Sequence, residues 1–335
     1  LPPPQPAEAI APAVPDLARL GFPTAQDKLA DTNAVGVFQH TGSGNEESGR
    51  FGSVRTGANG LARFHEGIDI ATLQRDSRGR PLDTVHAVAP GTVALVNRVA
   101  GNSDYGKYVV LLHDDPAGSV YTLYGHMAET AAGLTEGQRV QTGALLGKVG
   151  NTALDPIPMA RAHLHFEIGL LANPQFLSWP ARKQKNTPGG IYNGLNLLGV
   201  DPVQVFRRAL ATTNAFTFLA HLQQHPVAFE FMMRARRQLA FFEAHPSLWE
   251  GEPYRGEAMV LSVSEGGLPL KGRNATPEEL AGLGNLVHKV VRVDPLVLGR
   301  NGRRHVVSSG GRWILAQNGA TWLDLLTHPG GLRRP

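Results

Sequence analysis

The stretch Ala162-His163-Leu164-His165-Phe166-Glu167-Ile168 alternates apolar and polar side chains, which is the period of a β-strand. By this alternation the four apolar residues share one face, and the two histidines share the opposite face at a separation of about 7 Å. One imidazole of such a strand can bind a metal ion while the other remains unligated beside it.

Short strands of the same kind are predicted on both sides of this stretch. Gly, Pro or Asn interrupts residues 38–176 roughly every 8–12 residues, and β-branched or aromatic runs such as Tyr108-Val109-Val110-Leu111-Leu112 lie between the interruptions. This pattern predicts an antiparallel, mainly β domain over residues 38–176, without a long helix.

The segments on either side of this domain differ from it in composition. Residues 1–37 begin with a proline-rich stretch and start at Leu1 rather than Met, so we expect an exposed N-terminal segment of a processed, exported protein. Pro, Gly, Asn and Lys become frequent from the end of the β domain onward, which predicts a connecting segment over residues 177–200.

Residues 201–335 are predicted to form an α+β region of unknown role. Apolar residues recur at roughly helical spacing over residues 202–224 and again over residues 226–243, so we expect two helices there. Short strands are expected after them, for example over residues 287–293.

The overall composition excludes several classes of function. The chain has no cysteine and 13 histidines, so a metal site here must use His and carboxylate ligands. A net charge of only +4, without a dense Lys/Arg run, argues against nucleic-acid binding. No apolar run reaches the ~18 residues of a membrane-spanning helix.

Three short segments contain the residues that could bind a metal ion or act in catalysis. His65 and Asp69 are four residues apart, and Gly67 with the alternating isoleucines between and after them indicates an extended segment rather than a helix. In an extended segment Glu66 faces away from the metal site, so we expect it to have no catalytic role. His65, Asp69 and His165 would supply N, O and N ligands to a zinc ion and leave a fourth position for water, as in catalytic zinc sites.

The remaining candidates are two unligated histidines. His126 closes the segment Tyr124-Gly125-His126, and His163 is the second imidazole of the strand described above. Both would lie beside the water position as bases.

These residues resemble the M23 zinc metallopeptidases, the lysostaphin-like or LytM-like peptidoglycan endopeptidases. The resemblance extends from about residue 50 to residue 171 and rests on motifs in the same order, which are Gly49-Arg50-Phe51-Gly52-Ser53-Val54-Arg55, His65 to Asp69, Ala87-Val88-Ala89-Pro90-Gly91-Thr92-Val93, Tyr124-Gly125-His126, Gly143-Ala144-Leu145-Leu146-Gly147-Lys148-Val149-Gly150 and His163-Leu164-His165-Phe166-Glu167. By this resemblance His65, Asp69 and His165 match the zinc ligands of the family, and His126 and His163 match its catalytic histidines.

The resemblance implies a β-sandwich or duplicated-hybrid-like catalytic domain with one Zn²⁺ ion in a groove over the sheet. It also implies an exported enzyme, periplasmic or extracellular, that hydrolyses peptide cross-links in peptidoglycan. The alternative is a non-catalytic envelope protein of the same fold that binds peptidoglycan or activates another hydrolase. A third hypothesis is a latent enzyme, in which the N-terminal tail or the C-terminal region covers the groove and Asn33, Gln39 or His40 can occupy the fourth zinc position.

The sequence departs from the family pattern in two places. Residues 155–161 replace a short Gly/Ser-rich link before His163, and residues 74–83 form a longer polar loop. Arg55, Tyr124 and Asn151 could line the groove or serve packing and turns. The other nine histidines, which are His40, His86, His113, His221, His225, His245, His288, His305 and His328, are interpreted as surface or packing residues.

Overall fold

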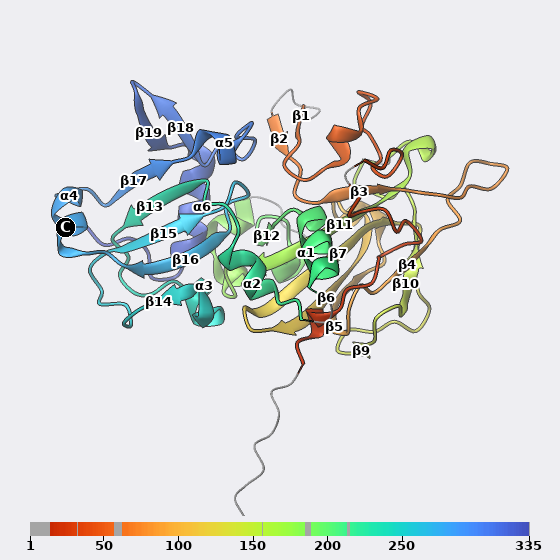
Figure 1. Cartoon of the computed structure of the whole chain (residues 1–335), viewed down its shortest axis with the longest axis horizontal. Coiled ribbons are helices and arrows are strands. Elements are labelled where there is room, and N and C mark those ends of the chain that lie inside the picture. The colour runs from red at the N-terminus through yellow and green to blue at the C-terminus, as the bar shows by residue number, and fades with distance from the viewer. Residues whose placement is uncertain are drawn as a thin grey trace, which may run out of the picture.

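The computed structural model describes residues 14–31, 33–56, 62–155, 157–184, 189–212 and 215–334. Two β-rich parts lie side by side, one formed by the N-terminal and middle segments and the other by the C-terminal segment (Figure 1). Among the described residues, no helix has the length and apolar character needed to cross a membrane.

The N-terminal part is built on a seven-stranded antiparallel sheet. Its strand order is β12-β11-β7-β6-β5-β9, and β3 pairs with the other end of β11. The strands are β3 (Ile68–Ala71), β5 (Gly91–Asn97), β6 (Lys107–Asp115), β7 (Gly118–Met127), β9 (Arg139–Val140), β11 (His163–Leu171) and β12 (Leu197–Gly199).

Smaller elements complete this part. Strands β4 (Thr84–His86), β10 (Leu145–Lys148) and β8 (Glu129–Thr130) form a three-stranded sheet, and β1 (Val54–Thr56) pairs with β2 (Ala62–Phe64). Seven 3₁₀ helices are described in and around these sheets, which are η1 (Asp16–Ala18), η2 (Glu46–Gly49), η3 (Ala100–Asn102), η4 (Met159–Arg161), η5 (Phe176–Ser178), η6 (Pro180–Gln184) and η7 (Gly190–Tyr192). The expectation of a mainly β domain without a long helix is therefore confirmed for the described residues.

The C-terminal part is α+β, as predicted. Its five-stranded sheet has the order β14-β16-β15-β13-β17, and a separate hairpin joins β18 to β19. The elements are α1 (Pro202–Ala211), α2 (Phe218–Gln223), β13 (Phe229–Met233), α3 (Ala240–Ala244), η8 (Pro246–Leu248), β14 (Trp249–Glu250), β15 (Met259–Val263), β16 (Pro269–Asn274), α4 (Pro277–Leu283), β17 (His288–Val293), α5 (Pro295–Leu298), β18 (Val306–Ser309), β19 (Arg312–Leu315) and α6 (Gln317–Thr327).

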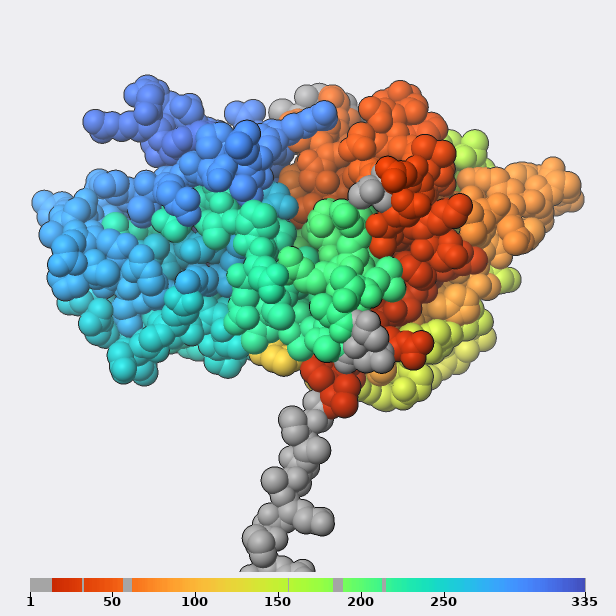
Figure 2. All heavy atoms as spheres, viewed as in Figure 1, coloured from red at the N-terminus to blue at the C-terminus, as the bar shows by residue number. Residues whose placement is uncertain are grey.

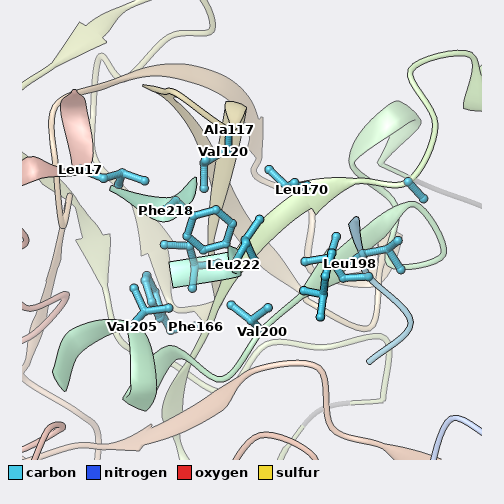
Figure 3. Packing of buried hydrophobic residues seen from close by; sticks show 14 of the residues in the cluster. Leu17, Ala117, Val120, Phe166, Leu170, Leu198, Val200, Val205, Phe218 and Leu222 are labelled. Atoms are coloured by element: carbon cyan, nitrogen blue, oxygen red, sulfur yellow. The ribbon is translucent and has the colours of Figure 1, made fainter. Parts of the chain in front are cut away.

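One hydrophobic core runs through both parts. Phe166 and Leu170 of β11, Val205 of α1 and Phe218 and Leu222 of α2 lie within the same cluster (Figure 3). Helices α1 and α2 therefore fill the space between the two parts, which stabilises the contact by burying apolar surface.

The helices predicted for residues 202–243 are partly wrong. Residues 202–224 form two helices, α1 and α2, rather than one, and the predicted helix over residues 226–243 contains strand β13 followed by the short helix α3. β13 is an inner strand of its sheet and is buried on both faces, so its apolar residues do not alternate and mimic helical spacing.

The two segments predicted to flank the β domain are more ordered than expected. In the N-terminal segment 1–37, residues 1–13 and 32 lie outside the described residues, but Leu17, Leu29 and Val37 are buried in the core, so the prediction of an exposed segment is wrong there. In the connecting segment 177–200, residues 185–188 lie outside the described residues, and β12 joins the main sheet beside β11. Apolar side chains that pack on the sheet explain both differences.

Candidate metal centre

The main sheet brings the separate sequence motifs together. Strand β11 pairs with β3 on one side and with β7 on the other, and this register places His165 opposite both Asp69 and Gly125. His65 lies between β2 and β3, and His126 lies near the end of β7. Antiparallel pairing therefore gathers residues from three distant segments.

His65, Asp69 and His165 form a buried group that could hold a metal ion. The Oδ1 atom of Asp69 lies 3.1 Å from Nε2 of His65 and 3.0 Å from Nδ1 of His165, and the two nitrogens are 3.2 Å apart. A tetrahedral zinc ion with bonds of about 2.0–2.1 Å separates its ligand atoms by about 3.3 Å. Both the spacing and the N, O, N donor set fit zinc.

Hydrogen bonds orient the two imidazoles of this group. The Nδ1–H of His65 donates to the carbonyl of Arg50 at 2.9 Å, and the Nε2–H of His165 donates to Oε1 of Glu167 at 2.8 Å. These bonds leave Nε2 of His65 and Nδ1 of His165 unprotonated in the neutral rings, which is the form that binds a metal.

Burial and the contacts among these residues shift the pKa values of Asp69 and His165. Burial raises the pKa of Asp69, but the nearby His65 and His163 outweigh it and hold that pKa well below its usual value. Burial lowers the pKa of His165, but hydrogen bonds to Asp69 and Glu167 raise it to about 9. The proton on Nδ1 of His165 lies where a metal would bind, so metal binding releases a proton.

His163 and His126 lie beside this group. The Nδ1–H of His163 donates to the carbonyl of Arg161 at 2.7 Å, and its Nε2 is 3.2 Å from Oδ1 of Asp69. This contact with Asp69 lacks the alignment of a hydrogen bond, so the buried Nε2 forms none among the described residues. A buried polar atom without a hydrogen bond, next to the candidate metal ligands, is suited to contact a bound ligand or water.

His126 adopts a backbone conformation that non-glycine residues rarely take. Its φ is 58°, its Nδ1–H donates to the carbonyl of Thr152 at 2.8 Å, and its ring centre is 4.9 Å from that of His163. Burial, followed by the proximity of His163 and His165, lowers the pKa of His126 well below its usual value. The ring is therefore neutral, with the lone pair of Nε2 free of a proton.

A buried network around Glu167, to which the sequence alone assigned no role, supports His165. Glu167 is fully buried and accepts hydrogen bonds from the Nε2–H of His165 and from the Tyr121 hydroxyl at 3.1 Å. Burial and then the nearby Glu167 raise the pKa of Tyr105 well above its usual value. The signal in the sequence is a carboxylate two residues after a ligand on the same strand face.

Of the three residues expected either to line the groove or to pack, only Arg55 reaches the metal group. Its Nη2 lies 2.6 Å from Oδ2 of Asp69. Tyr124 is buried, and its hydroxyl accepts a hydrogen bond from the backbone N–H of Val88. The Asn151 side chain donates to the carbonyl of Ile157, so it serves the local turn.

The group opens into a groove of about 1260 Å³. His65, His126 and His165 line it, together with residues 41–43, 47–48, 101–105 and 153–155. Gln39 donates to the carbonyl of His40 and the His40 ring donates to Thr41, so neither residue joins the metal group. Asn33 does not line the groove among the described residues.

Comparison with known proteins shows which family part of this chain resembles. Residues 63–175 match the sequence model of Peptidase family M23. This stretch covers about a third of the chain and contains all five candidate site residues; it is called the M23 domain here for its similarity to that family. No curated protein matches the chain in sequence.

Several solved structures are similar to the M23 domain. The catalytic domain of lysostaphin from Staphylococcus simulans is 20% identical over 36% of this chain and 76% of that chain, with a TM-score of 0.26. A point mutant of the catalytic domain of the prophage-encoded M23 protein EnpA from Enterococcus faecalis is 20% identical over 52% of this chain and 95% of that chain, with a TM-score of 0.29. A putative glycyl-glycine endopeptidase lytM from Ruminococcus gnavus is 22% identical over 44% of this chain and 48% of that chain, with a TM-score of 0.28.

The two departures from the family pattern contact each other. Arg75, from the longer polar loop, donates to the carbonyls of Met159 and Ala162 at 2.9 and 3.1 Å. Pro156 of the replaced link lies outside the described residues. Because Ala162 precedes His163, the loop of the M23 domain helps to hold that histidine in place.

Proposed function

We propose that this chain is a zinc-dependent endopeptidase that hydrolyses peptide cross-links in bacterial peptidoglycan. The observation that carries the proposal is the convergence of five side chains, of which His65, His126 and His165 line the groove. Three of their donor atoms lie at zinc spacing, with His163 Nε2 beside them. The M23 match of residues 63–175 supports the reaction class.

The roles within this proposal follow from the available nitrogen atoms. His65, Asp69 and His165 would hold the zinc ion. A bound zinc ion supplies a Lewis acid that polarises a carbonyl and lowers the pKa of water. The Nε2 atom of one of the two histidines, His126 or His163, would serve as the general base, and the other, with a proton on its Nε2, would stabilise charge on the cleaved carbonyl oxygen.

Removing one histidine at a time tests these roles. We expect purified full-length protein to contain about one zinc per chain and to release peptides from isolated peptidoglycan. His163→Ala should retain the zinc and lose cleavage by at least about 100-fold, because general acid–base catalysis contributes that much. His165→Ala should lose both zinc and cleavage, because it removes a ligand.

His86→Ala is a matched control. The His86 ring contacts Thr84 and the carbonyl of Gly143 and does not line the groove, so this variant should keep zinc and activity. Zinc in the wild type without cleavage of peptidoglycan would refute the proposed substrate. Absence of zinc would instead support the non-catalytic envelope protein.

The proposed substrate also places the protein outside the cytoplasm, in the periplasm or beyond it. Peptidoglycan peptides are then its partner, and no nucleic acid is involved.

A further inference from the structure

One loop of the C-terminal part reaches the groove of the M23 domain. Residues 299–305 connect α5 to β18, and Arg300 and Arg303 line the groove together with His65 and His126. In Figure 2, blue atoms of the C-terminal part approach orange atoms of the region that leads to His65. The C-terminal part therefore forms part of the groove wall.

The loop is packed tightly against the strands that precede His65. A Cβ atom on Gly302 would lie 2.8 Å from Cγ2 of Val54 and 3.2 Å from Cδ2 of Phe64, so only glycine allows this approach. The flanking residues Asn301 and Arg304 have φ values of 48° and 52°. Non-glycine residues keep such conformations where the surroundings hold them, often at functional sites.

Arg303 contacts both chain neighbours of His65. Its guanidinium carbon lies 5.0 Å from the centre of the Phe64 ring, and its Nη1 lies 3.1 Å from Oε1 of Glu66. A guanidinium has five N–H groups, and Glu66 is the only ion-pair partner of Arg303 among the described residues. Glu66, which has no place among the metal-binding residues, thus positions a cation at the groove.

Arg300 adds a second cation to the same wall. It is exposed and forms no ion pair among the described residues. Glu66 pairs with Arg303 alone, so the Arg300 guanidinium has no acidic ion-pair partner among the described residues. Guanidinium groups match the planar geometry of carboxylates and bind them through paired hydrogen bonds.

We propose that Arg300 and Arg303 bind a carboxylate of the peptide substrate, so that the C-terminal part helps to select the peptides that enter the M23 groove. This inference rests on the proposed function for the identity of the substrate, and a separate readout tests it. The two arginines act in binding and specificity, whereas the histidines of the metal centre act in the reaction.

The experiment measures binding without turnover. Full-length, zinc-loaded protein carrying His163→Ala is titrated with a fluorescent cross-linked peptide dimer that has free carboxylates, and with the same dimer made as carboxamides. We expect the carboxylate form to bind about tenfold more tightly, as two partly exposed charged contacts would provide. Arg300→Gln and Arg303→Gln together should reduce this preference to less than about twofold.

Arg304→Gln is the matched control, because it removes the same charge from the same loop at a residue that does not line the groove. It should keep the preference. Arg300→Gln alone changes only an exposed side chain, so a partial loss of preference there tests the proposal even if Arg303→Gln disturbs folding.

Three results would overturn the proposal. These are equal binding of the two dimers by the parent protein, a preference that survives the double substitution, and a loss in Arg304→Gln as large as in Arg300→Gln. Cleavage of peptidoglycan by protein with His163 intact is measured in parallel. A preference that depends on the arginines without any cleavage would support this inference and refute the proposed endopeptidase.

Discussion

Gly67→Ala should disrupt the metal centre without touching a ligand. Gly67 lies between His65 and Asp69, where β3 begins to pair with β11. A Cβ atom there would lie 2.3 Å from the carbonyl oxygen of Phe166 and 2.8 Å from Cγ of Glu167. The nearest obstacle is backbone in the middle of a sheet, which cannot rotate away.

The size of the effect follows from this distance. A carbon atom approaches a carbonyl oxygen no closer than about 3.3 Å in ordinary contacts, so β3 and β11 must separate by about 1 Å near Gly67. The pair Asp69 and His165 lies close by on the same two strands, and its ligand atoms are 3.0 Å apart. We expect unfolding to become about 1–3 kcal/mol easier, as for other overpacked sites, and zinc affinity to fall at least about tenfold.

Urea unfolding followed by tryptophan fluorescence, together with zinc titration, measures both quantities. Gly101→Ala is the matched control, because Gly101 lines the groove but has no atom within 4 Å of the added Cβ. That variant should stay within about 0.5 kcal/mol of the wild type. If Gly67→Ala were as stable as Gly101→Ala and bound zinc equally well, the close approach of β3 and β11 would be refuted.

Two further predictions concern buried polar groups. Tyr121→Phe removes a hydrogen bond to the buried Glu167 carboxylate and should lower the free energy of unfolding by about 1.5–3 kcal/mol. Tyr108→Phe is its control, because the Tyr108 hydroxyl has no partner among the described residues, and it should change the free energy of unfolding by less than about 0.5 kcal/mol. Equal losses of the two variants in urea unfolding would contradict this prediction. Burial, followed by the proximity of His225 and Arg208, lowers the pKa of His221 to about 3. Below about pH 6.5 the unfolded chain therefore binds a proton at this residue that the folded chain does not bind, and stability falls as the pH drops. His221→Leu should therefore gain about 2 kcal/mol relative to wild type between pH 8 and pH 5, and a difference that does not vary with pH would contradict the linkage.

The alternation in residues 162–168 can be read from the sequence because it is local. Successive side chains of a strand point to opposite faces, so the positions of His163 and His165 on one face depend only on the residues between them. The same holds for the extended segment from His65 to Asp69, where Gly67 argues against a helix. The absence of cysteine likewise limits a metal site to His and carboxylate ligands.

Other features required the tertiary structure. The spacing of apolar residues predicts a helix over residues 226–243, but β13 is an inner strand, and burial on both faces removes the alternation that marks a strand in the sequence. The proline-rich start of the chain predicts an exposed segment, although Leu17 and Leu29 are fully buried. Proline content describes local stiffness and does not reveal which apolar side chains find a surface to pack against.

The sequence by itself thus determined the mainly β fold class, the kinds of metal ligand available and the side chains that share a strand face. The tertiary structure decided that β3 pairs with β11 in the register that sets Asp69 against His165, that Glu167 orients His165, and that Arg303 reaches Glu66 from the C-terminal part. The physical reason is that side-chain alternation follows from the geometry of neighbouring peptide units. Pairing between distant segments depends instead on the packing and hydrogen bonding of the whole chain.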